Sequence, residues 1–84
     1  MLLYAIHKYI VRNEENYMER MSGSKLKAFR RSNGLNQYEM ARTIGVSLSM
    51  YEKVERGSIK ASRNFIEKTK IVYPHIDVSY IFFN

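Results

Sequence analysis

Apolar residues recur every three or four positions through most of the chain, and turn residues separate the runs. This spacing predicts short amphipathic helices. In the first clear run, Leu26 and Phe29 share one helical face. Ser24 can cap its start, and the pair Asn33 and Gly34 supplies the left-handed conformation that commonly ends a helix. We therefore expect a helix between Ser24 and Gly34.

The next run is bounded by a capping signal and an early glycine. Asn36 can cap a second helix, and Glu39, three residues later, can reach back to the Asn36 amide in a capping box. Gly45 ends this helix within about two turns. Ser47 can then cap a third helix, which ends at Gly57. The interior faces of these two helices are expected to carry Met40, Ala41, Ile44, Val46, Tyr51 and Val54.

The short connection at Gly45 implies a sharp corner between the second and third helices. Two helices that cross at roughly 90 to 120° approach most closely at a small residue, and Ala41 lies at that position. Tyr51 and Val54 face inward from the third helix. The outward-facing residues are then Leu48, Ser49, Glu52 and Lys53. These four side chains are expected to be free to contact another molecule.

A fourth run opens at Ser62 and reaches about Val72 before Pro74 forbids its continuation. Its inner face carries Phe65, Ile66 and Thr69. Asp77 can cap a final short helical turn. The residues of that turn are too apolar to remain in water, so we expect the C-terminus to fold back and close the core with Tyr80, Ile81 and Phe82.

The first 23 residues have a weaker pattern. Leu3, Ile6 and Ile10 recur at helical spacing, but a gapped alternation of two also fits this segment. The polar run 13–16 continues without a turn signal, which favours a helix over residues 3–17. This helix could pack on the rest of the chain, dimerise, or do neither. Ser22 to Ser24 is interpreted as a linker, so we expect an extension over residues 1–23 and a domain over residues 24–84.

Length and composition limit the class of protein. At 84 residues, with 45% hydrophobic and 26% charged residues, the chain is expected to form one small folded domain. It has no cysteine and two histidines, neither near a second ligand, so we expect no metal or other cofactor. The apolar start is interrupted too early for a membrane span and has no signal-peptide pattern. These features favour a cytoplasmic protein without a membrane partner.

The net charge of +6 is unevenly distributed. Residues 1–23 are neutral overall, whereas residues 24–70 carry eleven lysines and arginines against four glutamates, an excess of seven positive charges. Concentrated positive charge favours a polyanionic partner, although basic residues also commonly solvate helical surfaces. Charge alone therefore does not identify nucleic acid as the partner.

The motif between Gln37 and Arg56 resembles the helix-turn-helix of phage-repressor, Cro and XRE proteins, and the resemblance covers Ser24 to about Phe83. Ten or more positions agree at fixed spacing. The matching residues are Leu26, Arg30, Gly34, Leu35, Asn36, Gln37, Met40, Ala41, Gly45, Val46, Ser47, Tyr51, Val54, Glu55 and Gly57. The resemblance implies an all-α, compact, five-helix, lambda-repressor-like DNA-binding domain of bacterial or phage origin, to which the N-terminal segment adds an extra helical extension.

The resemblance also implies roles for individual residues. The helix 48–56 is expected to lie in the major groove of double-stranded DNA, with base contacts from Leu48, Ser49, Glu52 and Lys53. Phosphate contacts are expected from Gln37, Ser47, Lys60 and Arg63. Arg30 and Glu55 are implied to form a partly buried, structural ion pair. Glu52 departs from the family pattern, because an acid repels phosphate. It could accept from a cytosine amine, but the spacing favours a pair with Arg56.

These features favour a sequence-specific transcriptional regulator, more readily a repressor than an activator. An enzyme is not expected, because no nucleophile with a base, no carboxylate pair at a plausible cleft and no phosphate-binding glycine loop occurs. The alternative is an antitoxin or co-regulator whose main partner is another protein. One helix reads few base pairs, so we expect a homodimer on a palindrome. The candidate dimer surfaces are the face of residues 3–11 and the patch of residues 80–82.

Overall fold

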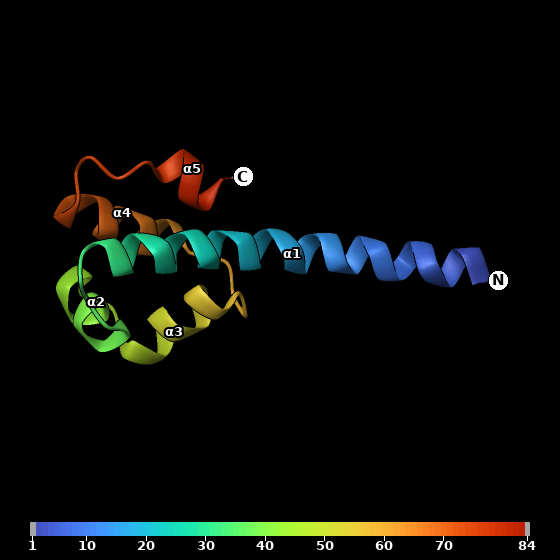
Figure 1. Ribbon diagram of the computed structural model, residues 1–84, viewed down its shortest axis with the longest axis horizontal. Helices are drawn as coiled ribbons and strands as arrows, with labels where there is room; N and C mark the ends of the chain where they lie inside the picture. Colours follow the sequence, from blue (N-terminus) through green and yellow to red (C-terminus); the bar gives the residue numbers. More distant parts are fainter. Residues whose placement is uncertain (1, 84) are drawn as a thin grey trace.

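Five helices occupy the part of the chain that the computed structural model describes, namely the backbone of residues 2–83 and the side chains of residues 17–83 (Figure 1). That part contains no strand. The all-α, five-helix fold expected from the sequence is confirmed. The helices are α1 (Leu2–Ser32), α2 (Gln37–Ile44), α3 (Leu48–Arg56), α4 (Arg63–Val72) and α5 (Val78–Phe82).

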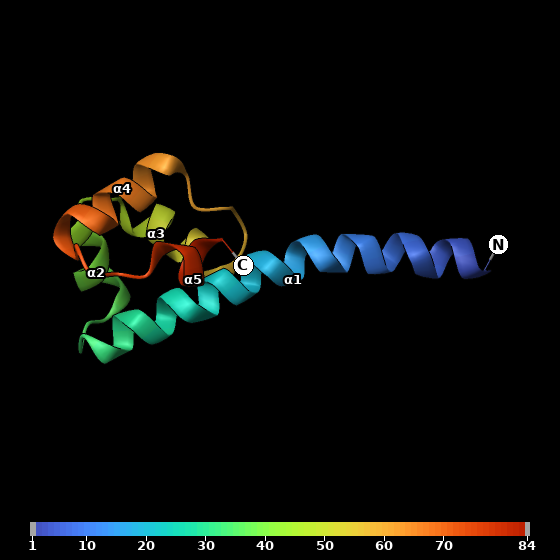
Figure 2. The same cartoon turned by 90° about the horizontal axis from the view of Figure 1, so that it is seen from above.

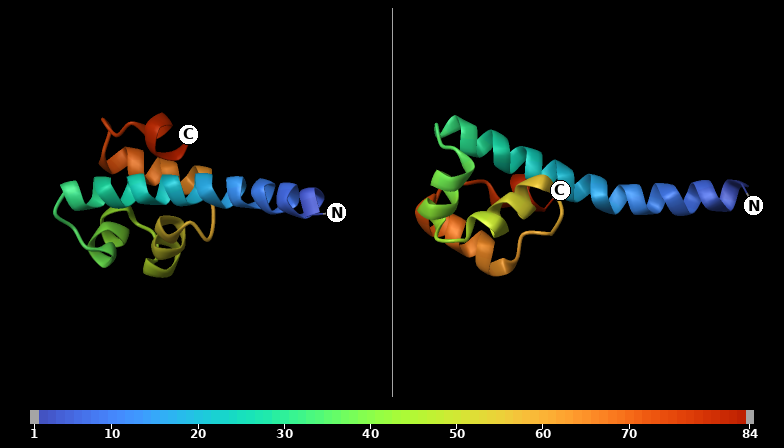
Figure 3. Two further views of the ribbon diagram at one scale, coloured as in Figure 1. Left: turned by 45° about the vertical axis from the view of Figure 1, so that its right-hand side comes forward. Right: turned by 90° about the horizontal axis from the view of Figure 1, so that it is seen from below.

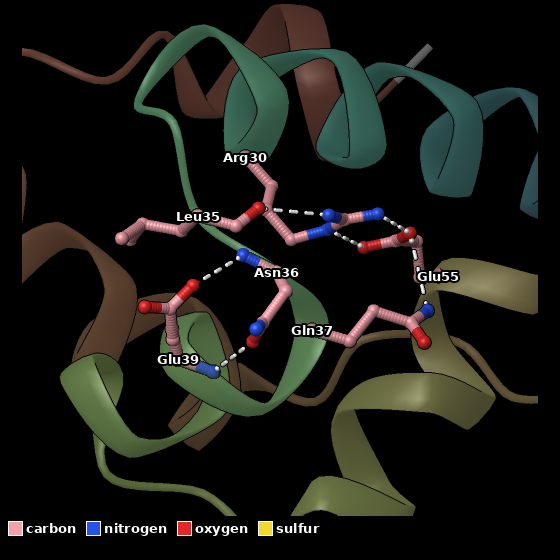
Figure 4. A network of polar contacts seen from close by, with 6 residues as sticks. All are labelled: Arg30, Leu35, Asn36, Gln37, Glu39 and Glu55. Atoms are coloured by element: carbon pink, nitrogen blue, oxygen red, sulfur yellow. Dashed lines mark hydrogen bonds and ion pairs between the residues drawn. The ribbon is translucent and has the colours of Figure 1, made fainter.

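The helix starts from α2 to α5 follow the capping residues in the sequence. The side chains of Asn36, Ser47, Ser62 and Asp77 each accept a hydrogen bond from a backbone amide in the first turn of the helix that follows. At α2 the capping box is complete, because the Glu39 carboxylate also accepts from the Asn36 amide at 2.9 Å (Figure 4). Local side-chain hydrogen bonds therefore define where these four helices begin.

The N-terminal segment and the first expected helix form one continuous helix, α1. The linker interpretation of Ser22 to Ser24 is therefore wrong, and so is the expected cap at Ser24. Gly23 is buried where α1 crosses the end of α3: a Cβ at this position would lie 2.8 Å from the carbonyl carbon of Glu55. Glycine serves close helix packing here, and the proposed division at residue 23 has no break in the backbone to mark it.

The core lies between the C-terminal half of α1 and the other four helices. α3 and α5 pack on α1, whereas α4 packs on α2 and α5 (Figure 2). Tyr51 stacks on Phe65 with ring centroids 6.0 Å apart, and Phe65 meets Phe82 edge to face at 6.2 Å. The buried apolar residues are Leu26, Met40, Ala41, Ile44, Tyr51, Val54, Phe65, Ile76, Ile81 and Phe82.

The C-terminal turn closes the core with two of the three residues expected to do so. Ile81 and Phe82 are buried, but Tyr80 is 54% exposed. Its ring lies beneath the ammonium of Lys25, which is 4.2 Å from the ring centroid and donates to the Tyr80 carbonyl oxygen at 3.2 Å. Tyr80 thus covers the surface of the α1–α5 contact, and the candidate dimer patch 80–82 is mostly internal.

The N-terminal half of α1 projects beyond the other helices, and the described fold measures 49 × 23 × 22 Å along its principal axes (Figure 3). The other candidate dimer surface, the face of residues 3–11, lies outside the side chains that the structure describes. At 31 residues α1 has the length to cross a bilayer. No helix within residues 2–83, however, is both long and apolar enough to do so.

Candidate nucleic-acid interface

α2 and α3 meet at a tight corner centred on Gly45. This residue adopts a left-handed conformation (φ 82°, ψ 36°), and its amide donates to the Ala41 carbonyl at 2.9 Å, which ends α2. The Val46 amide donates to the same carbonyl at 3.0 Å. Ala41 is buried, in keeping with a small residue at the contact between the two helices. The corner separates the two helices, as a helix-turn-helix requires.

α3 has a buried inner face and an uncovered outer face. Tyr51 is fully buried and Val54 nearly so, and together they hold α3 against the core. On the other side, Leu48 is 38% exposed, and Ser49 and Lys53 are exposed. Glu52 is half-buried. The four residues predicted to contact bases therefore share one side of α3, on which Leu48, Ser49 and Lys53 are exposed and Glu52 is partly covered.

The predicted pair between Glu52 and Arg56 does not form. Arg56 instead donates from Nε to the Ser58 hydroxyl at 2.8 Å, and Glu52 makes no ion pair within residues 17–83. The left-handed turn at Gly57 ends α3 and brings Ser58 back toward the last turn of the helix. This short bond competes well with an exposed ion pair, which stabilises a helix only slightly.

Arg56 is the residue of the outer face that the sequence analysis missed. It lies seven residues after Ser49 and three after Lys53, so the three residues follow one side of α3. Arg56 is exposed. The spacing of four and then three residues identifies this position, but the helical spacing of Glu52 and Arg56 favoured an ion pair between them instead. The outer face therefore carries two cations, from Lys53 and Arg56, and one carboxylate.

A buried ion pair ties α3 to the end of α1 (Figure 4). Arg30 donates to both carboxylate oxygens of Glu55, from Nε at 3.0 Å and from Nη2 at 2.8 Å. Its third nitrogen, Nη1, donates to the Leu35 carbonyl at 2.8 Å. The two side chains are 9% and 3% exposed. Each of the three guanidinium nitrogens thus donates to an oxygen, and a bidentate pair with such additional hydrogen bonding holds charge in the interior at a lower cost.

The same pair keeps Glu55 ionised. Burial alone raises the pKa of Glu55, but the hydrogen bonds and positive charge of Arg30 outweigh it, so the pKa lies below its ordinary 4.5. The hydrogen bond to Glu55 likewise raises the pKa of Arg30. Burial also raises the pKa of Tyr51, with the charge of Glu55 adding to the effect, so its hydroxyl stays neutral.

The network reaches one of the predicted phosphate contacts. Gln37, the first residue of α2, donates from Nε2 to Glu55 Oε1 at 3.2 Å. This bond uses one of its two amide hydrogens and leaves the second available to an acceptor outside the protein. Gln37 is half-buried. Its amide is therefore oriented by the same carboxylate that joins α1 to α3.

The other predicted phosphate contacts lie apart from this network. Ser47 caps α3, and its hydroxyl accepts from the Met50 amide at 3.1 Å. Lys60 is exposed in the connection between α3 and α4. Arg63, the first residue of α4, donates to Glu67 at 3.1 Å, but their side chains are 92% and 59% exposed, so solvent screens this pair strongly. All three side chains lie near helix ends that flank α3.

This arrangement defines a small helical DNA-binding domain, and comparison with known proteins agrees. A family model described as helix-turn-helix matches residues 26–68, just over half of the chain, from the middle of α1 into α4. The chain therefore belongs to the XRE-type helix-turn-helix family of DNA-binding transcription regulators, which are typically not enzymes. Neither the curated proteins nor the solved structures that were searched gave a match.

Proposed function

We propose that this protein is a cytoplasmic, sequence-specific repressor that reads the major groove of double-stranded DNA with the outer face of α3. The observation that carries the proposal is the division of α3 into a fully packed inner side and a side left open to solvent. A helix held in this way can enter the groove without disturbing the core. Repression follows from occupancy of an operator.

The side chains on that face suggest which bases are read. Leu48 can pack on a thymine methyl, and Ser49 can donate to or accept from several base edges. Lys53 suits the acceptors of guanine. Glu52 forms no ion pair within residues 17–83, so its carboxylate is available to accept from a cytosine amine. Because the carboxylate of Glu52 suits cytosine and the ammonium of Lys53 suits guanine, we expect an operator with adjacent C·G and G·C pairs.

A homodimer is the state in which we propose that the protein acts. One recognition helix contacts too few base pairs to select a site in a genome, whereas two copies related by a two-fold axis read two half-sites about 34 Å apart. Gln37, Ser47, Lys60 and Arg63 would contact the flanking phosphates and set the register of each copy. Because the two copies are related by a two-fold axis, we expect the operator to contain an inverted repeat.

Selection of duplexes from a random library, followed by affinity measurements over a salt series, tests the proposal. The expected result is an enriched inverted repeat whose binding weakens steeply with salt, because lysine and arginine displace counterions from phosphate. Lys53→Ala should relax the preference at one base pair of each half-site. A library that shows no enrichment, together with binding that is indifferent to salt, would refute the proposal.

The alternative function, an antitoxin or co-regulator with a protein as its main partner, is favoured by one observation. Tyr80 and Phe83 at the C-terminal end are more than half exposed, although both are aromatic. The salt series separates the two functions. A protein whose main partner is another protein should bind DNA weakly and without sequence preference.

A further inference from the structure

We propose that Arg56, positioned by Ser58, binds a DNA phosphate at the C-terminal end of the recognition helix. This inference rests on the proposed function. It assigns a role to a residue for which the family resemblance supplied none, and it gives Ser58, a residue of the loop after α3, a positioning role.

The position of Arg56 is the first argument. It is the last residue of α3, exposed, and it follows Ser49 and Lys53 along the outer side of the helix. In a helix-turn-helix, residues near the start of the recognition helix contact base edges. A side chain at the opposite end of the same face meets the phosphate backbone, because the helix leaves the groove there. The ligand of Arg56 is therefore a phosphate rather than a base.

The second argument is the hydrogen bond that restrains the side chain. Arg56 Nε donates to Ser58 Oγ at 2.8 Å, and the Ser58 amide donates to the Lys53 carbonyl at 2.9 Å. The hydroxyl is thus anchored to α3 through its own backbone. Nε is the guanidinium nitrogen bonded to the aliphatic part of the side chain. The hydrogens of the two terminal nitrogens, Nη1 and Nη2, therefore remain available to an acceptor outside the protein. A guanidinium oriented before binding loses less conformational freedom when the phosphate arrives.

The third argument is that the charge of Arg56 is not neutralised by the protein. The charge of Arg30, by contrast, is neutralised by its buried pair with Glu55. Arg56 forms no ion pair within residues 17–83, although Glu52 lies one helical turn away. It also precedes Lys60 and Arg63, the two cations proposed to contact phosphates beyond α3.

The test compares the affinity of the selected duplex for four forms of the full chain over a range of sodium chloride concentrations. These are the unchanged protein, Arg56→Gln, Ser58→Ala and the control Lys70→Gln, in which an exposed cation of α4 is removed. Fluorescence anisotropy gives each dissociation constant, and circular dichroism establishes that each form is folded. The slope of log affinity against log salt counts the phosphates that are neutralised.

Arg56→Gln should weaken binding about tenfold and reduce the salt slope by about 0.9, without changing the preferred sequence. Ser58→Ala should weaken binding roughly threefold with an unchanged slope, because the charge remains but is less well oriented. Lys70→Gln should change the slope by less than Arg56→Gln does.

Four results would overturn the inference. An unchanged slope for Arg56→Gln, or a slope that Lys70→Gln lowers equally, would mean that Arg56 makes no specific phosphate contact. A lost preference at one base pair would make Arg56 a base contact. Unchanged affinity in Ser58→Ala would refute the role of Ser58 in positioning Arg56. Failure of the unchanged protein to bind the duplex would instead refute the proposed function itself.

Discussion

Gly23→Ala tests the contact between α1 and α3. In an exposed helix this substitution is stabilising, because glycine has the poorer helix propensity by about 1 kcal/mol. Gly23 is buried, however, and its missing side chain is what lets the two helices approach. A Cβ would lie 2.8 Å from the carbonyl carbon of Glu55 and 3.1 Å from the carbonyl oxygen of Val54. We therefore expect the sign of the effect to be reversed.

The magnitude follows from what the new methyl group would meet. Both neighbours are backbone atoms at the end of α3, so neither can rotate away, and relief requires the two helices to separate. Overpacking of this kind costs roughly 1 to 3 kcal/mol, and a rigid neighbour favours the upper end. Subtracting the propensity gain leaves a net loss of about 2 kcal/mol. For a domain of this size, that lowers the melting temperature by roughly 8 to 16 °C.

Urea denaturation followed by circular dichroism gives the free energy of unfolding of both forms. The matched control is Ser24→Ala, the next residue of α1, whose side chain is exposed. That change should stabilise by a few tenths of a kcal/mol, as helix propensity predicts (about 0.5 at most). If Gly23→Ala also stabilised the protein, the claim that α1 and α3 pack too closely for a side chain at residue 23 would be refuted. Residue 23 would then behave as an ordinary helix position.

Three further outcomes are expected. Glu55→Ala leaves the Arg30 guanidinium buried without its partner, so it should cost roughly 3 to 5 kcal/mol, measured by urea denaturation, and a change below about 1 kcal/mol would contradict the burial of the pair. Because the folded-state pKa of Glu55 is lowered, its contribution is complete above its ordinary pKa of 4.5 and is lost as the pH falls through the folded value. The unfolding free energy should therefore fall more steeply below pH 4.5 in the unchanged protein than in Glu55→Gln, and parallel curves would refute the shift. Lys53→Ala should leave the melting temperature unchanged, since the residue is exposed, but should reduce discrimination at one base pair by about 1 to 3 kcal/mol in competition binding. Equal loss on every sequence would make Lys53 a phosphate contact.

The helix boundaries that could be predicted from the sequence depend on local chemistry. Asn36, Ser47, Ser62 and Asp77 each form a hydrogen bond within three residues, so the signal and its partner are close in the chain. Gly23 could not be interpreted in this way. Its partner is the backbone of residue 55, and glycine between two serines is typical of a linker when that distant contact is unknown.

The buried side of α3 could be predicted from the sequence, whereas the partner of Arg56 on the opposite side could not. The burial of Tyr51 and Val54 follows from helical periodicity, so the opposite side could be identified. The partner of Arg56 depends on the conformation of the chain after Gly57, which determines where Ser58 lies. Periodicity carries no information about that turn. Tyr80 is a similar case, because its exposure depends on how α5 docks on α1.

The link between Gln37 and the Arg30–Glu55 pair constrains how such a protein can diverge in evolution. Ser49 and Lys53 are exposed and make no buried contact within residues 17–83, so new operators can be acquired by exchanging them one at a time. Gln37 has less freedom, because its amide completes the environment of a carboxylate on which the interior depends. Descendants that recognise different genes should therefore still begin α2 with a side chain able to donate to that carboxylate.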